Sequence, residues 1–176
     1  MRVLVVFICL VAAKSISAAT CAGGNTHFRF RDYGVNISWH SSPAYFMSVD
    51  LERGLVFSED YGEPFESCNE EEQVLFESCI KSFAFDFAIP KDYQDTDHWT
   101  FNGRNYEKFD SVSLVALGKS EQVDRIVAEH QGVNFVYLYS PEKGLRGILF
   151  PRELRDAAQL FLSADESGPF ALCKDS

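Results

Sequence analysis

The dipeptide Asn102-Gly103 constrains the fold more than any other feature of this chain. Asn-Gly between alternating apolar and polar residues is the strongest short-range signal of a β-hairpin. A two-residue turn at this point fixes the register of the two strands and sets one group of side chains on a single face. The predicted cross-strand pairs are Phe101 with Arg104, Trp99 with Tyr106, and Asp97 with Lys108.

Other segments repeat this pattern of strand, turn and strand. Apolar and polar residues alternate over 27–31 and 35–40 on either side of Gly34. Two further pairs of strands are indicated by their turns: 45–49 and 55–57 flank a turn that ends at Gly54, and 135–139 and 145–150 flank a turn that ends at Gly144. Further strands are predicted over 83–89 and 112–117. These patterns predict antiparallel sheet built from hairpins.

The segment before residue 83 is compatible with two structures. Helical spacing of Leu75, Phe76, Cys79 and Ile80, with a capping box from Asn69 to Glu72, indicates a helix. However, the sequence Phe-Glu-Ser-Cys occurs at both 65–68 and 76–79, and a hairpin turning over 69–73 would bring its two cysteines together. A straight helix would hold them about 16 Å apart, beyond disulfide reach. We favour the hairpin.

Two short helices are expected in the C-terminal half. Ser120 provides a cap, Val123, Ile126 and Val127 form an apolar stripe, and Gly132 ends the pattern. A second stripe follows Pro151 and comprises Leu154, Ala157, Ala158, Phe161 and Leu162. The predicted fold class is therefore α+β, predominantly antiparallel β-sheet built from hairpins, with one or two short helices in the C-terminal half.

Residues 1–19 have the features of a secretory signal peptide: a positive start, an apolar run over 3–13, and a small-x-small site at Ser17-Ala18-Ala19. A membrane span needs about 20 apolar residues, and no segment is long enough, so no span is predicted. We expect a single disulfide-bonded α+β domain over 20–176, secreted or periplasmic. A lipid anchor on Cys21 is disfavoured, because the leucine and the small residue directly before cysteine that such processing favours are missing.

The cysteine count fits export. Cys9 leaves with the signal peptide, and the four remaining cysteines are an even number in an oxidising compartment, which predicts two disulfides. Four cysteines allow three pairings. We favour Cys68–Cys79, which are close in sequence, and Cys21–Cys173, which would join the two ends of the domain. A cysteine nucleophile is then not expected, since a disulfide sulfur is no thiolate.

Charge restricts the partners that this protein can have. The formal net charge of −10 becomes −12 once Arg2 and Lys14 leave with the signal peptide. Such a charge argues against nucleic acid and anionic membranes as partners, whereas a basic protein, a cationic ligand or calcium is compatible with it. No Lys or Arg occurs from Gly54 to Ile80. This block holds eight acids: Glu59, Asp60, Glu63, Glu66, Glu70, Glu71, Glu72 and Glu77.

A second candidate contact lies at 91–99. Asp92, Asp95 and Asp97 offer oxygen ligands, but calcium needs six to eight oxygens in a glycine-bearing loop, and the spacing of an EF-hand is missing. Tyr93 and Trp99 suit this loop to protein contact instead. His27, His40, His98 and His130 lack the spacing of a zinc site, so no metal or other cofactor is predicted.

No catalytic motif is present in the sequence, and we name no catalytic residue. The favoured function is an exported small binding protein, an inhibitor or immunity-type protein, that docks an acidic surface on a cationic enzyme or toxin and is itself a monomer. The candidate contacts are Glu66, Glu70, Glu71, Glu72, Asp92, Tyr93, Asp95, Asp97 and Trp99. The alternatives are an exported hydrolase that uses carboxylates and a self-associating surface or matrix component.

Overall fold

The computed structural model describes residues 25–32, 46–58, 61–116, 118–151 and 159–172. Several expectations fall outside these ranges. They are the signal peptide at 1–19, the strand at 35–40 and the Cys21–Cys173 disulfide. No helix formed by the described residues is long and apolar enough to cross a membrane.

A large antiparallel sheet of ten strands forms the body of the molecule, in the order β4-β3-β2-β1-β13-β12-β11-β10-β9-β8. Because neighbours in sequence are neighbours in the sheet, hairpins build most of it, and only the contact of β1 with β13 joins distant parts of the chain. The strands are β1 (His27–Asp32), β2 (Phe46–Asp50), β3 (Leu55–Ser58), β4 (Tyr61–Pro64), β8 (His98–Phe101), β9 (Arg104–Ala116), β10 (Lys119–His130), β11 (Val133–Ser140), β12 (Gly144–Phe150) and β13 (Gln159–Ser163).

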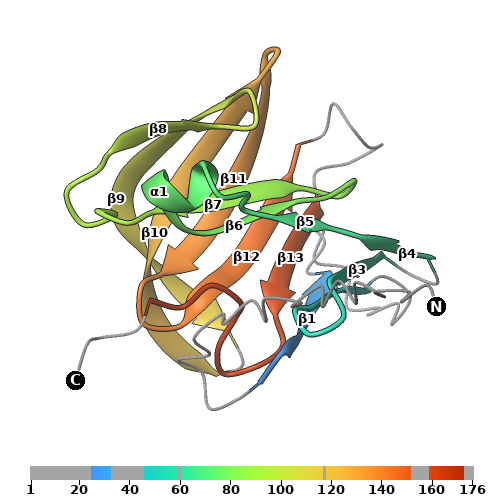
Figure 1. Ribbon diagram of the computed structural model, residues 1–176. Coiled ribbons are helices and arrows are strands. Elements are labelled where there is room, and N and C mark those ends of the chain that lie inside the picture. The colour runs from blue at the N-terminus through green and yellow to red at the C-terminus, as the bar shows by residue number, and fades with distance from the viewer. Residues whose placement is uncertain (1–24, 33–45, 59–60, 117, 152–158, 173–176) are drawn as a thin grey trace, which may run out of the picture.

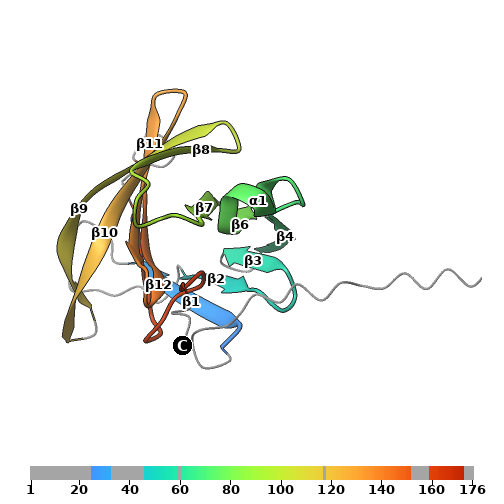
Figure 2. The ribbon, with the colours of Figure 1, turned by 60° about the vertical axis from the view of Figure 1, so that its left-hand side comes forward.

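A small sheet lies against the inner face of the large one. It consists of β5 (Glu66–Ser67), β6 (Phe76–Lys81) and β7 (Asp86–Pro90), and the one-turn helix α1 (Glu72–Leu75) connects β5 to β6. Figure 2 shows the large sheet curving around one side of the molecule with the small sheet within the curve. Every residue of β7 is buried, and the ring of Phe87 lies 4.9 Å from that of Tyr137 on β11. Side chains of the small sheet therefore fill the space that the large sheet encloses.

Two tyrosines fix the small sheet to the large one. The hydroxyls of Tyr106 and Tyr137 both donate to the backbone carbonyl of Asp86, at 2.8 and 2.6 Å. Burial raises the pKa of both phenols, so they stay protonated and keep donating. The carboxylate of Asp86 in turn accepts from Nε of Arg104 at 2.9 Å. The first residue of β7 thus has polar contacts with both β9 and β11.

The Asn102-Gly103 hairpin is confirmed. Both turn residues have positive φ, 47° and 71°, as a type I′ turn requires. Trp99 pairs with Tyr106 in the predicted register, and their rings stack with centroids 5.4 Å apart. The hairpins β2–β3 and β11–β12 are confirmed as well, as is the general prediction that antiparallel sheet dominates.

The helix expected from Ser120 to Gly132 is wrong, because this segment is strand β10. Its hydrophobic spacing misleads because the strand buries side chains on both faces. Val123 is 1% exposed, whereas Ile126 and Ala128 are fully buried. Odd and even positions of a strand point to opposite faces, so burial on both sides produces the three-residue interval that is typical of a helix.

The second expected helix is also wrong over its described residues, which form strand β13. Phe161 and Leu162 belong to β13, are adjacent, and are both buried. The residues 152–158 of that stripe lie outside the described part of the chain. At Phe30 and Arg31, β1 pairs with β2 on one edge and with β13 on the other.

The strand predicted over 83–89 starts later than expected. Ser82 forms a turn in which its hydroxyl donates to the carbonyl of Phe85 at 2.7 Å and accepts from the Phe85 amide at 3.1 Å. Phe83 lies on this turn and is 50% exposed, so β7 begins at Asp86. The alternation of phenylalanines therefore continues beyond the strand that it indicates.

The segment that follows β13 closes one end of the large sheet. It packs against the β11–β12 turn through backbone hydrogen bonds from Leu145 N to Pro169 O at 2.8 Å and from Gly168 N to the carbonyl of Lys143 at 2.6 Å. The hydroxyl of Tyr139 also donates to the carbonyl of Phe170. Backbone meets backbone here, which leaves no space for side chains.

Candidate functional site

The turn between β5 and β6 carries the one-turn helix α1 beside the small sheet (Figure 1) and is closed by a disulfide. The predicted Cys68–Cys79 disulfide is present, with a Cα–Cα distance of 5.3 Å. Both structures considered for this segment contribute to it, since β5 and β6 pair as a hairpin and the capping box forms within its loop. The amide of Glu72 donates to Oδ1 of Asn69 at 2.9 Å, and the amide of Asn69 donates to Oε2 of Glu72 at 3.0 Å.

Several side chains of this turn are exposed, and we call four of them the acidic turn: Glu70, Glu71, Val74 and Leu75. Val74 is 71% and Leu75 64% exposed. No ion pair between described residues involves Glu70 or Glu71, nor the flanking acids Glu66 and Glu77, which are also exposed. Apolar groups and unpaired carboxylates therefore lie side by side on a structure that holds its shape.

Glu72 differs from its neighbours, because it stabilises the turn. Its carboxylate lies 2.7 Å from Nζ of Lys81 on β6. The hydrogen bond from Lys81 lowers the pKa of Glu72 and outweighs burial, which acts in the opposite direction. Of the acids predicted as partner contacts, Glu66, Glu70 and Glu71 are thus available to a partner, and Glu72 is engaged within the protein.

The loop between β7 and β8 surrounds a lysine from β9. Nζ of Lys108 donates to the backbone carbonyls of Tyr93 and Gln94, at 2.8 and 3.2 Å, and lies 3.3 Å from Oδ1 of Asp97. It also lies 4.8 Å from the centroid of the Tyr93 ring. Of the three carboxylates that the sequence offered as metal ligands, only that of Asp97 contacts this ammonium group. No group of metal-ligating side chains occurs among the described residues.

This loop corrects part of the predicted contact surface. Tyr93 is 1% exposed and donates its hydroxyl to Asp124 at 2.8 Å, so it supports the loop from below. Trp99 is half-buried against Tyr106. Asp92 and Asp95 are exposed, and Asp97 is exposed although it pairs with Lys108. Two aspartates with no ion pair in the described structure therefore remain for contact.

Replacing Lys108 by Met is expected to destabilise the protein by about 1–3 kcal/mol, because two carbonyls and a carboxylate lose a charged donor. Lys91→Met is the matched control, since Lys91 is exposed and has no side-chain contact in the described structure; it should stay within about 0.5 kcal/mol of the wild type. Urea unfolding of both variants measures the difference. Equal stability of the two variants would show that the ammonium does not hold the loop.

A groove of about 610 Å³ crosses the outer face of the large sheet at β8, β9, β10 and β11. Two rows of side chains line it, and the sheet register sets each residue opposite the next. One row is His98, Glu107 and Val127, and the other is Thr100, Asn105, Glu129 and Asn134. Phe109 lies beside the first row. Of these residues, the sequence patterns singled out only His98, as a histidine without the spacing of a zinc site, and Val127, as part of the expected helical stripe; they did not predict a groove.

A second hollow, of about 430 Å³, lies at the turn between β2 and β3. The carboxylate of Asp50 is there 3.7 Å from both Nδ1 of His27 and Nε of Arg53, and one of its oxygens accepts from the Arg53 amide at 3.0 Å. Asp50 is 8% exposed. These contacts stabilise the β2–β3 turn, and this structural role explains why His27, Asp50 and Arg53 lie together.

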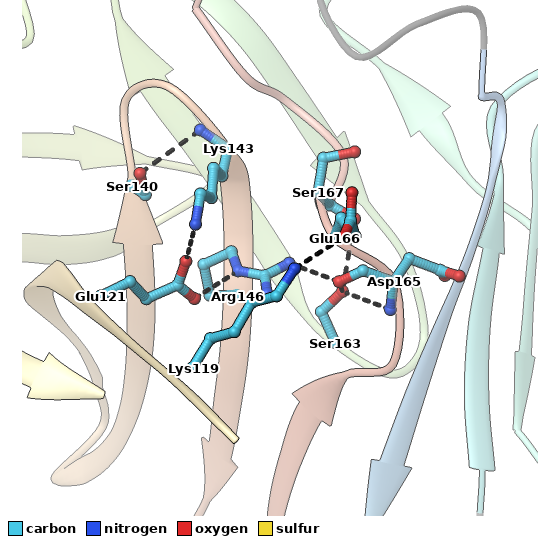
Figure 3. A network of polar contacts seen from close by, with 9 residues as sticks. All are labelled: Lys119, Glu121, Ser140, Lys143, Arg146, Ser163, Asp165, Glu166 and Ser167. Carbon is cyan, nitrogen blue, oxygen red and sulfur yellow. Dashed lines mark hydrogen bonds and ion pairs between the residues drawn. The ribbon is translucent and has the colours of Figure 1, made fainter. Parts of the chain in front are cut away.

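The more buried carboxylates of the described structure are also engaged. Figure 3 shows Glu121 between Lys143, at 2.5 Å, and Nε of Arg146, at 2.7 Å. Asp124 accepts from Tyr93 and from Ser111 at 2.6 Å. Asp86 is held by Arg104 in the same manner. These three carboxylates lie in separate networks, and none of the three lines either groove.

Comparison with known proteins returns no matching family model, no similar curated protein and no similar solved structure.

The sequence patterns missed the apolar part of the acidic turn. Leu75 was assigned to the apolar stripe of a possible helix and Val74 was not singled out, yet both side chains are exposed. Because the repeat Phe-Glu-Ser-Cys already indicated a disulfide-closed hairpin, the exposed position of its loop was open to prediction. The groove was not, since it depends on which strands lie side by side.

Proposed function

We propose that this protein is an exported binding protein, of the inhibitor or immunity type, that docks its acidic turn on a cationic enzyme or toxin. The observation that carries the proposal is the presence of exposed Val74 and Leu75 beside unpaired Glu70 and Glu71 on a disulfide-closed turn. Exposed apolar groups on a rigid element do nothing for stability and are typical of contact surfaces. Preorganisation also lowers the entropy that binding costs.

The two kinds of side chain have separate roles in this proposal. Val74 and Leu75 would enter an apolar depression of the partner and supply most of the affinity, because buried anchors dominate interface energetics. Glu70 and Glu71 would face Lys or Arg residues and increase the association rate, because opposite potentials steer the encounter. The formal charge of −10 for the chain reinforces this steering.

Export is part of the same proposal. The Cys68–Cys79 disulfide is compatible with an extracellular or periplasmic location, since such bonds persist in oxidising compartments. The partner would accordingly be a basic protein met outside the cytoplasm, and the protein would act as a monomer.

Biolayer interferometry of the mature protein against purified basic secreted enzymes, including a lysozyme, a ribonuclease and a trypsin-type protease, tests the proposal. We expect binding to at least one that weakens as salt rises. The double variant Glu70→Lys with Glu71→Lys should lower the association rate at least about tenfold. Val74→Ser with Leu75→Ser should mainly accelerate dissociation, since lost anchors act on the lifetime of the complex.

Asp110→Lys is the matched control, because Asp110 is an exposed acid on β9, away from the turn. It changes the net charge by two units, as Glu70→Lys or Glu71→Lys alone does. The association rate should stay within about twofold of the wild-type value. Binding that is insensitive to both double variants would reject the acidic turn as the docking site. If Asp110→Lys weakens binding as much as the single variant Glu71→Lys, net charge explains the result and the position of the acids does not.

A further inference from the structure

The groove on the outer face of β8–β11 has the properties of a small-molecule site. Its volume of about 610 Å³ lies within the range of such sites, about 300–1,000 Å³. Its walls are side chains of four neighbouring strands, whose backbone hydrogen bonds fix their spacing at about 4.8 Å. Directly beneath it, the inward-facing residues Tyr106, Ala128 and Phe135 are buried in the core. The floor is therefore rigid.

Two carboxylates in this groove lack a cationic partner. Glu107 and Glu129 take part in no ion pair between described residues. One oxygen of Glu129 accepts from the amide of Gly132 at 2.6 Å, which orients the carboxylate. Glu107 pairs with Val127 in the sheet, and Glu129 is two residues further along the same strand. Residues in this diagonal relation have backbone positions about 7–8 Å apart. At that separation the two like charges repel each other.

His98 also lines the groove and lies opposite Glu107 in the sheet, without an ion pair to it in the described structure, and the other lining groups are polar and uncharged or apolar. Thr100, Asn105 and Asn134 provide hydroxyl and amide groups on the row that contains Glu129. The hydroxyl of Thr100 already donates to Oδ1 of Asn105 at 3.2 Å. Val127 forms an apolar centre between the two acids. Arg125 does not line the groove; its guanidinium lies over the Phe109 ring at 4.8 Å, at that end of the groove.

We propose that this groove binds a small organic cation, a protonated amine attached to a compact apolar body. The ammonium would lie between Glu107 and Glu129 and relieve their mutual repulsion, and the body would cover Val127 and Phe109. The amide groups of Asn105 and Asn134 would contact polar substituents. A carboxylate or phosphate ligand would add a third negative charge, and a neutral ligand would leave both acids uncompensated. This inference does not depend on the acidic turn, which lies on the small sheet.

Three probes of nearly equal shape test the proposal: phenethylamine, 2-phenylethanol and 3-phenylpropanoate. Titrations of the mature protein are followed by NMR, with the side-chain amides of Asn105 and Asn134 as local reporters. We expect phenethylamine to saturate at millimolar concentration and to bind at least about tenfold more tightly than the alcohol, because a charged group strengthens each hydrogen bond. The anion should not bind.

Glu107→Gln and Glu129→Gln should each weaken phenethylamine binding about five- to tenfold, the effect of one charged contact. Glutamine keeps the acceptor that Gly132 uses, so both variants retain the local structure. Glu71→Gln removes the same charge from the acidic turn and should change the affinity less than twofold. The proposal is overturned if the alcohol binds as tightly as the amine, if the shifts map elsewhere, if Glu71→Gln weakens binding as much as Glu107→Gln, or if no probe saturates.

Discussion

Replacing Glu121 by Leu is expected to cost about 3–5 kcal/mol of unfolding free energy, because it leaves a buried guanidinium without its counter-charge. The side chain of Arg146 is only 5% exposed and that of Glu121 12% exposed. Lys143, at 42% exposure, can turn to water, whereas Arg146 cannot. Urea unfolding at neutral pH gives the difference, and a loss below about 1 kcal/mol would show that water or another group replaces the carboxylate.

The double variant Glu121→Leu with Arg146→Met separates the charge from the packing. Apolar replacements of a complete buried ion pair are often nearly neutral. The double variant should therefore be more stable than Glu121→Leu alone, although it also loses the hydrogen bond from Arg146 to the carbonyl of Asp165 (Figure 3). If the loss in the double variant equals the sum of the losses in Glu121→Leu alone and Arg146→Met alone, Glu121 and Arg146 do not interact energetically.

The same network should contribute to acid unfolding. Burial by itself raises the pKa of Glu121, but hydrogen bonds from Lys143 and Arg146 hold it below the ordinary value of 4.5. A carboxyl whose pKa is lower in the folded state stabilises the protein above its unfolded pKa and loses that effect as pH falls through the folded pKa. Stability measured from pH 5 to 3 should therefore fall less steeply in the double variant. Glu72, whose pKa is also lowered, leaves a residual slope in both proteins.

Gly144→Ala is expected to destabilise the protein by about 3 kcal/mol, since it combines backbone strain with overpacking. Gly144 has a φ of 77°, in the left-handed region. An added Cβ would lie 2.2 Å from the carbonyl oxygen of Pro169 and 2.6 Å from that of Gly168, and both are backbone atoms that cannot turn aside. Thermal or urea unfolding measures the loss.

Gly54→Ala is an unusually close control for this substitution. The sequences Glu52-Arg53-Gly54-Leu55 and Glu142-Lys143-Gly144-Leu145 are alike, and both glycines end a hairpin turn with positive φ. At Gly54, however, no atom lies within 4 Å of the added Cβ. Only the strain remains, about 1 kcal/mol. Equal losses at the two positions would mean that the segment 168–171 does not pack on the β11–β12 turn as described.

Local chemistry made the hairpins predictable. The residue preferences of a two-residue turn act within Asn102-Gly103 itself, and the register of Trp99 with Tyr106 follows from that turn. The Cys68–Cys79 bond was predictable from a repeated tetrapeptide. The burial of β10 and β13 on both faces was not predictable from local patterns, and for this reason both strands were mistaken for helices. Tyr93 was assigned to the surface because no local pattern indicates that it lies beneath Lys108.

Local sequence was sufficient to place the turns that end at Gly54 and Gly144 and the turn at Asn102-Gly103, because turn residues act over a few positions. The acidic character of the segment that includes Glu70 and Glu71 was also evident from the sequence. The tertiary structure alone decided that β1 pairs with β13, that the small sheet fills the curve of the large one, and that Glu107 and Glu129 share a groove. Those outcomes depend on contacts between residues far apart in the chain, whose free energies no local pattern contains.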